Sequence, residues 1–290
     1  MSITWKHLRL NGLPICDWEK LGSAIRFSKT WLKSIDFTGV RVVSNSQSPP
    51  SKSALTRNEK ICHFWKGFQQ ILPEIDNIEL LKFGSVPLFV IDDILNTMEK
   101  QPWTRIHTLI VSNLFDNVDP NQSCSIKFLS KIASINNSLK LLKFDSNNGF
   151  VLHDDPHSEQ YESILLALKQ LSKLHTFECV SLKDFTVEQF AQLFDHLNTN
   201  RLKHLSIGSC STWFIQPEND DSSKVECLFE NLSKFSNLTF LRLRDVTINS
   251  GHSSHLVNLF ESLIIVENLI LDNIIIQKSG KIIFFLCELS

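Results

Sequence analysis

The sequence predicts an α/β solenoid of about nine strand–helix repeats, with a parallel sheet on its concave face and helices on its convex face. Three observations predict this fold. A triplet of large apolar residues at positions i, i+3 and i+5 recurs nine times along the 290 residues. Between triplets the apolar period becomes helical, which indicates a helix after each strand. The interval of 28 residues recurs between triplets, and it suits one strand–helix unit.

The triplets predict the strands in order along the chain. Their first residues are separated by 27, 46, 28, 33, 35, 28, 36 and 28 residues. Within each triplet, positions i+3 and i+5 point to one side of a strand, and positions i+2 and i+4 point to the other. Each triplet therefore predicts a short strand that is buried on one side. The triplets are Trp5/Leu8/Leu10, Leu32/Ile35/Phe37, Ile78/Leu81/Phe83, Ile106/Leu109/Val111, Leu139/Leu142/Phe144, Leu174/Phe177/Cys179, Leu202/Leu205/Ile207, Leu238/Leu241/Leu243 and Val266/Leu269/Leu271.

Four of the segments between triplets show the apolar period of a helix. Two of them carry a capping-box signature, Thr186 with Gln189 and Ser223 with Glu226. Strands that alternate with helices through short connections must be parallel, with right-handed crossovers. Because one unit alone leaves its apolar ladder exposed, stacking of neighbouring units stabilises the fold. The helical sets are Tyr161/Ile164/Leu165/Leu168, Val187/Phe190/Phe194/Leu197, Val225/Leu228/Phe229/Leu232 and Leu256/Leu259/Phe260/Leu263.

The triplet resembles the LxxLxL core of leucine-rich repeats, and the resemblance covers nearly the whole chain. The unit length is similar to that of the long, ribonuclease-inhibitor-like class, in which each repeat is a strand followed by a helix. The sequence departs from the family pattern because no regular Asn or Cys follows the core strand and because the spacing is uneven. The resemblance implies a recognition module, as in ubiquitin-ligase adaptors, innate-immune sensors or host-targeting effectors.

Composition excludes several classes of protein. With 42% hydrophobic and 21% charged residues, the chain can bury a core, and long disorder is excluded. A net charge of −2 argues against nucleic acid as a partner. Seven cysteines without a CxxC pair, and a polar N-terminal segment unlike a secretory signal, predict a reducing, cytoplasmic compartment. The most apolar stretch, Leu263–Ile276, is interrupted by Glu, Asp and Asn residues, so no membrane span is predicted.

Insertions lengthen four of the units. A basic, Ser/Pro-rich insertion near 41–59 is expected to be disordered. Three others, near 113–125, 146–159 and 209–222, should emerge together at the carboxyl ends of the strands. Their aromatic and acidic side chains suit a partner with a basic surface. Alternatively, the aromatics cover helix ends and the acids favour helix N-termini. The residues are Phe115, Phe150, Trp213 and Phe214, with Asp116, Asp119, Asp154, Asp155, Asp220 and Asp221.

The exposed strand positions i+2 and i+4 predict a binding face. They mix charged, hydroxyl and apolar side chains, which favours a protein or peptide over a phosphate backbone. Phe240, Arg242 and Arg244 share one strand, and aromatic–arginine sets are typical of interface anchors. A solubilising role remains open for Lys143. The candidate partner-binding residues are Phe240, Arg242, Arg244, His204, Glu178, Lys143, Trp213, Phe214 and Phe150.

No motif predicts catalysis, a cofactor or a metal site. The cluster His153-Asp-Asp-Pro-His157 has metal-ligand residue types without a recognised ligand spacing, so a solvated turn is favoured. Cys62–His63 and the pair His204/Cys210 are too close in sequence to favour a nucleophile and its base. Cys179 lies on the apolar ladder, where we expect a small apolar filler.

We therefore predict a single, non-enzymatic solenoid domain over 1–290 that recognises another protein or peptide. It would use its concave sheet and its acidic-aromatic loops. One alternative is a GTPase activator, because Arg41 follows the second triplet as the catalytic arginine does in similar proteins of the Ran type. Another is a subunit of an assembly in which a last helix, at the apolar C-terminal segment Ile282–Leu286, is covered by another chain. We expect instead that the chain is part of a longer protein.

Overall fold

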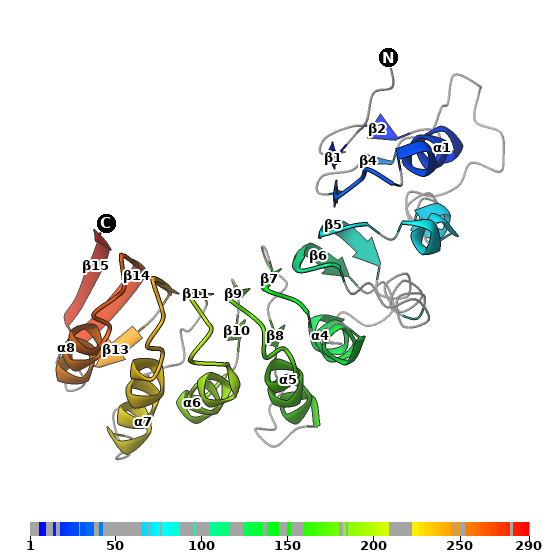
Figure 1. Ribbon diagram of the computed structural model, residues 1–290. Helices are drawn as coiled ribbons and strands as arrows, with labels where there is room; N and C mark the ends of the chain where they lie inside the picture. Colours follow the sequence, from blue (N-terminus) through cyan, green and yellow to red (C-terminus); the bar gives the residue numbers. More distant parts are fainter. Residues whose placement is uncertain are drawn as a thin grey trace. The chain divides into compact units, whose positions relative to one another are not determined.

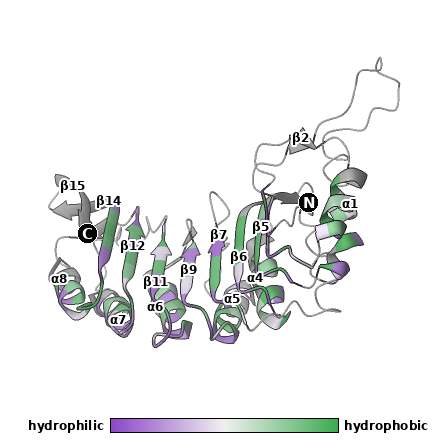
Figure 2. Cartoon of the chain, turned by 45° about the horizontal axis from the view of Figure 1, so that its top comes forward, coloured by the Kyte–Doolittle hydropathy of each residue, from purple (hydrophilic) through white to green (hydrophobic). Residues whose placement is uncertain are grey.

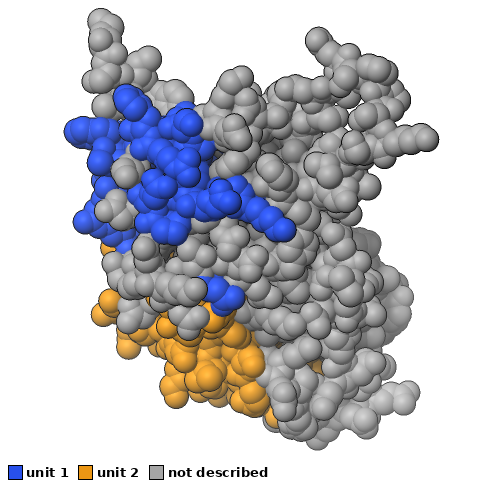
Figure 3. All heavy atoms as spheres, turned by 90° about the vertical axis from the view of Figure 1, so that its right-hand side faces the viewer, with its two compact units in different colours: residues 1–124 blue, residues 125–290 orange. Residues whose placement is uncertain are grey.

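The computed structural model describes residues 6–9, 14–15, 18–28, 30–37, 41–42, 65–68, 70–75, 77–87, 96, 105–115, 124–135, 138–144, 150–151, 159–179, 182–183, 185–208, 222–245, 247–249, 253–278 and 281–289. They belong to two compact units, Met1–Cys124 and Ser125–Ser290 (Figure 3). The alternation of strands and helices that the sequence predicts is present in both units. The prediction of one domain over the whole chain stays a prediction.

The N-terminal unit contains the first four predicted strands. These are β1 (His7–Arg9), β3 (Ser34–Asp36), β5 (Leu80–Pro87) and β6 (Thr108–Phe115), which pair in parallel in that order (Figure 1). Helix α1 (Trp18–Ser28), helical residues 65–68 and 70–71, and the 3-10 helix η1 (Leu72–Glu74) lie between the strands in sequence. Two short strands, β2 (Pro14–Ile15) and β4 (Arg41–Val42), form a second parallel pair.

The C-terminal unit contains the other five predicted strands. These are β7 (Leu141–Phe144), β9 (Thr176–Cys179), β11 (His204–Ile207), β12 (Phe240–Arg244) and β14 (Asn268–Lys278), all parallel and paired in that order. Helix α4 (Cys124–Ile135) precedes β7. Helices α5 (Glu159–Gln170), α6 (Val187–His196), α7 (Ser222–Ser233) and α8 (Ser253–Ser262) lie on one side of the strands (Figures 1 and 2). The short strands β8 (Phe150–Val151) and β10 (Leu182–Lys183) pair with each other, and β13 (Thr247–Asn249) pairs with the end of β14.

The apolar ladder lies where the sequence predicts it. In the seven triplets from Leu32 to Leu243, every residue is at most 2% exposed. Within each unit the ladder residues of neighbouring strands are in register, so Leu205 lies opposite both Phe177 and Leu241. The ninth triplet is less buried, with Leu271 at 8% exposure. Trp5 and Leu10 lie outside the described residues.

A repeated backbone hydrogen bond fixes the start of each strand. Within each unit, the carbonyl of residue i+1 in one repeat accepts hydrogen bonds from the N–H groups of residues i+1 and i+2 of the next repeat. In the N-terminal unit, the Lys6 carbonyl accepts from Lys33 at 2.8 Å and from Ser34 at 3.2 Å. In the C-terminal unit, the Lys140 carbonyl accepts from His175 at 2.7 Å and from Thr176 at 3.0 Å. Residues at i+1 are therefore side by side on successive strands.

One predicted capping box is confirmed and the other is wrong. At the start of α6, the Thr186 hydroxyl accepts from the Gln189 N–H at 3.2 Å, and the Gln189 side chain accepts from the Thr186 N–H at 2.9 Å. Helix α7 begins at Ser222, so Ser223 lies within the helix and is not its N-cap. Asp220, Asp221, Ser222 and Ser223 are all residue types that can cap a helix, and the sequence pattern does not distinguish them.

The C-terminal segment is a strand, which corrects the prediction of a last helix. Strand β15 (Lys281–Leu289) runs antiparallel to β14 and pairs with it from Leu269 to Lys278. The β-branched and aromatic residues in Ile282–Leu286 favour this conformation. The sheet of this unit is therefore parallel from β7 to β14 and ends with one antiparallel strand.

A buried tyrosine links α5 to α6. The Tyr161 side chain is 2% exposed, and its hydroxyl donates to the Gln189 carbonyl at 2.7 Å. Its oxygen lies 3.1 Å from Oε1 of Gln192. Burial raises the pKa of Tyr161, so the hydroxyl stays a neutral donor.

Replacing this hydroxyl tests the link. We expect Tyr161→Phe to lower the free energy of unfolding by about 1 kcal/mol, because a buried hydrogen bond is lost while the ring still packs. Urea denaturation measures the change. The control Ser236→Ala removes an exposed hydroxyl and should leave stability unchanged. Equal stability of wild type and Tyr161→Phe would show that the hydrogen bond contributes nothing.

Candidate binding surface on the sheet

Six of the nine predicted partner-binding residues lie together on the C-terminal unit. They occupy positions i+2, i+4 and i+6 of strands β7, β9, β11 and β12, on the face opposite the buried ladder. Each is neither buried nor fully exposed. Together with Asp272 on β14 they form what we call the polar row. Its members are Lys143, Glu178, His204, Phe240, Arg242, Arg244 and Asp272.

Glu178 lies between a lysine and a histidine of the polar row. Its carboxylate accepts from Nζ of Lys143 at 2.8 Å and from Nε2 of His204 at 3.1 Å. The hydrogen bond from His204 and the contact with Lys143, against the opposing effect of burial, together lower the pKa of Glu178 to about 2. The carboxylate is therefore ionised at neutral pH. It holds both neighbouring side chains in place.

The next contact in the polar row is an aromatic stack. His204 and Phe240 are opposite each other on β11 and β12. Their ring centroids are 3.9 Å apart and the planes differ by 5°. Because Glu178 binds one edge of the imidazole, the stack is fixed in orientation. It gives the row a flat apolar surface beside charged groups, a combination that suits protein recognition.

Two arginines share one carboxylate at the end of the polar row. Nε of Arg242 donates to Oδ2 of Asp272 at 2.8 Å, and Nη2 of Arg242 also contacts this oxygen. Nε of Arg244 lies 3.6 Å from the same oxygen. Two guanidinium groups around one carboxylate leave an excess of positive charge. Much of Arg244 is free to bind, since its side chain is 41% exposed.

Asp272 is the residue of the polar row that sequence reasoning missed. It lies directly opposite Arg244 in the register of β12 and β14. The signal was available, because Asp272 occupies position i+6 of the ninth triplet and Arg244 occupies position i+6 of the eighth. The exposed positions predicted for the ninth strand were i+2 and i+4, and both come before Asp272 in the chain.

Of the other three predicted site residues, only Phe150 is among the described residues. Phe150 lies in the short strand β8, opposite Leu182, and not in a loop as predicted. Trp213, Phe214 and the six aspartates of the insertions lie outside the described residues. Arg41 also belongs to a strand, β4, and not to the predicted loop, while the rest of that insertion, 43–59, lies outside the described residues. The Ran-type alternative therefore stays a prediction about Arg41.

Most of the other chemical candidates are not described by the structure: His153–His157, Cys62–His63 and Cys210 lie outside the described residues. In the part of the chain that the structure describes, no three His, Cys, Asp or Glu side chains are grouped to hold a metal ion. Cys179 is fully buried in the ladder, which confirms its predicted packing role. Within the described ranges, no helix is long and apolar enough to cross a membrane.

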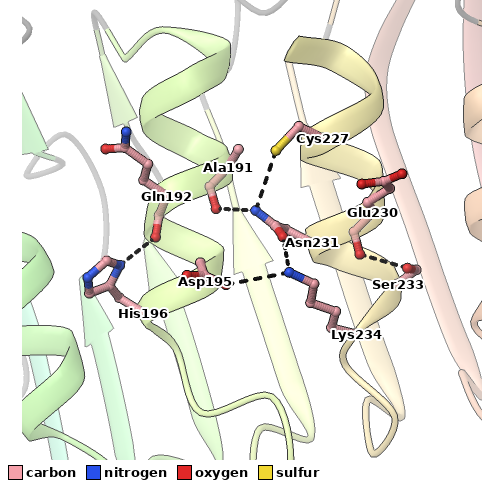
Figure 4. A network of polar contacts seen from close by, with 9 residues as sticks. All are labelled: Ala191, Gln192, Asp195, His196, Cys227, Glu230, Asn231, Ser233 and Lys234. Carbon is pink, nitrogen blue, oxygen red and sulfur yellow. Dashed lines mark hydrogen bonds and ion pairs between the residues drawn. The ribbon is translucent and has the colours of Figure 1, made fainter. Parts of the chain in front are cut away.

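A polar network joins α6 and α7 on the helical side (Figure 4). Nδ2 of Asn231, a residue 7% exposed, donates to the Ala191 carbonyl at 2.8 Å. Nζ of Lys234 contacts Oδ1 of Asn231 at 2.5 Å and Asp195 at 3.5 Å. A cavity of about 320 Å³ lies beside the network, lined by Glu188, Ala191, Gln192, Asp195, His196, Cys227 and Asn231. The buried amide satisfies a helix carbonyl, so the network has a structural role.

These observations define the class of the protein. Parallel strands alternate with helices in each unit, and the seven triplets from Leu32 to Leu243 are buried. This arrangement is an α/β leucine-rich-repeat fold, the fold of a repeat protein. The assignment to the ribonuclease-inhibitor-like class stays a prediction. No family model matches the chain, and no curated protein matches it. Among solved structures it is similar to the leucine-rich repeat-containing protein LegL7 from Legionella pneumophila. That match has a TM-score of 0.46 and 11% sequence identity, and it covers 96% of this chain and 76% of LegL7.

Proposed function

We propose that this chain is a non-enzymatic recognition module of the cytoplasm that binds another protein or peptide through the polar row. The polar row itself is the observation that carries the proposal. Seven side chains from five adjacent strands lie on one face, fixed by mutual contacts and still partly exposed. A pre-ordered surface loses little side-chain entropy on binding, which favours affinity.

The composition of the polar row supports a protein partner. Arginine and aromatic side chains are enriched among residues that dominate protein interfaces. Phe240 offers the aromatic anchor, and Arg242 is already oriented by Asp272. Adaptor, sensor and receptor roles all use a surface of this kind.

The proposal is tested with a random peptide library displayed on phage. Peptides enriched on the wild-type chain are synthesised and titrated by isothermal calorimetry. We expect the double variant Phe240→Ala/Arg242→Ala to weaken their affinity about tenfold, because truncation of an interface anchor typically costs more than 1 kcal/mol. The melting temperature should change little, since both side chains are partly exposed.

A matched control uses the same residue types in the other unit. Phe27 is 76% exposed and Arg26 is also exposed, so Phe27→Ala/Arg26→Ala removes a phenylalanine and an arginine that do not belong to the polar row. The control should leave peptide affinity unchanged. If both double variants bind the peptides as the wild type does, the polar row is not the binding surface.

A further inference from the structure

A second charged surface lies where the strands of the C-terminal unit begin. The backbones of Lys140, His175 and Lys203, each at position i+1, are linked by hydrogen bonds. The His175 N–H donates to the Lys140 carbonyl at 2.7 Å, and the Lys203 N–H donates to the His175 carbonyl at 2.8 Å. Neighbouring strands are about 4.8 Å apart, so these three side chains start from adjacent points on one edge. Lys140 and Lys203 are exposed, and His175 is half-buried.

The charge at this edge is positive and unbalanced. Arg201, in the turn before Lys203, adds a third exposed cation. Among the residues that the structure describes, Lys140, Arg201 and Lys203 take part in no ion pair. Burial lowers the pKa of His175, and the positive charges of Lys140, Lys203 and Arg201 lower it further. Beyond Lys203, the residues at position i+1 of the next two strands are Thr239 and then Glu267; we call this series of i+1 residues on successive strands a column.

The residues at position i+1 in the N-terminal unit include a carboxylate of the chain itself. There, Lys6, Lys33, Glu79 and His107 follow one another on successive strands. The Glu79 carboxylate pairs with Lys33 at 2.5 Å and lies 3.8 Å from Nε2 of His107. The chain therefore supplies an anionic partner for Lys33. The column of the C-terminal unit has His175 in the place of this carboxylate.

We propose that Lys140, His175, Arg201 and Lys203, which we call the basic edge, dock an acidic segment of a partner protein. Carboxylates from the partner supply the negative charge that Glu79 supplies in the other unit. The edge spans two strand spacings, about 10 Å, which suits a short run of Asp or Glu residues. The net charge of −2 disfavours a nucleic acid, whose binding usually needs many phosphate contacts. The basic edge is separate from the polar row, which uses positions i+2, i+4 and i+6.

The test measures binding of a fluorescein-labelled hexaglutamate peptide by fluorescence anisotropy at low ionic strength. We expect Lys140→Ser/Lys203→Ser to weaken binding about fivefold, as the loss of two exposed ion pairs predicts. His175→Glu should weaken binding at least as much, because it places a carboxylate between Lys140 and Lys203, as Glu79 lies between Lys33 and His107. Added salt should weaken binding to the wild type.

A matched control removes two exposed lysines of the N-terminal unit. Lys6→Ser/Lys66→Ser changes the net charge as much as the first variant and should leave peptide binding unchanged. Equal losses in the two double variants would overturn the proposal, because binding would then depend on net charge alone. Tighter binding of a fluorescein-labelled hexadeoxythymidylate than of hexaglutamate would also overturn it, in favour of nucleic acid. Neither result bears on the polar row, which the peptide titrations of Phe240→Ala/Arg242→Ala test separately.

Discussion

Replacing Leu205 with alanine is expected to lower the free energy of unfolding by about 2–5 kcal/mol. Leu205 is fully buried, and it lies in register between Phe177 and Leu241, which are also fully buried. The substitution removes apolar contacts and leaves a cavity in the middle of the ladder. Because neighbouring strands are held by their own hydrogen bonds, the cavity has little freedom to collapse.

Urea denaturation followed by circular dichroism measures the loss. The control is Leu166→Ala on α5, which removes the same atoms from a leucine that is 59% exposed. It should change the free energy of unfolding by no more than about 0.5 kcal/mol. Similar losses for both variants would mean that the ladder is not the main source of stability.

The strands could be predicted from sequence because two independent constraints agree there. Alternation within a triplet specifies a strand, and the recurrence of triplets specifies its neighbours and their register. All nine predicted strands are present. The same logic predicted the face on which Lys143, Glu178, His204, Phe240 and Arg242 lie, since position i+2 or i+4 decides the face.

Elements outside the repeat were harder to predict. The segment that forms β15 is a short apolar run, and such a run does not distinguish a strand from a buried helix by periodicity. Strands such as β2, β8 and β10 have two residues each, too few to form a pattern. Their pairing depends on neighbouring units.

Specific contacts of the site were predicted least. Six of the seven residues of the polar row could be named from sequence. Asp272 could not, because its shared use by Arg242 and Arg244 depends on three-dimensional register. The role of Asn231 on the helical side could not be predicted either. Its buried amide has an acceptor only because the Ala191 carbonyl of the neighbouring helix lies within hydrogen-bond distance. The basic edge becomes visible only when the i+1 columns of the two units are aligned by their backbone hydrogen bonds.

Protonation of Glu178 should lower the stability of the chain at acid pH. Its pKa in the folded chain is about 2, below its ordinary value of 4.5, so its ionised form stabilises the fold. This contribution is complete above pH 4.5 and is lost as the pH falls through about 2. Allowing for solvent screening of a carboxylate whose side chain is 18% exposed, we expect a contribution of about 2 kcal/mol.

The variant Glu178→Gln isolates this contribution from that of the other carboxylates. At pH 7 it should unfold at lower urea concentration than the wild type, because Lys143 and His204 lose their anionic partner. As the pH falls from 4.5 towards 2, the difference between variant and wild type should shrink towards zero. Glu162→Gln, at an exposed position of α5, should match the wild type at every pH. A difference that stays constant with pH would mean that the ionised state of Glu178 is not what stabilises the fold.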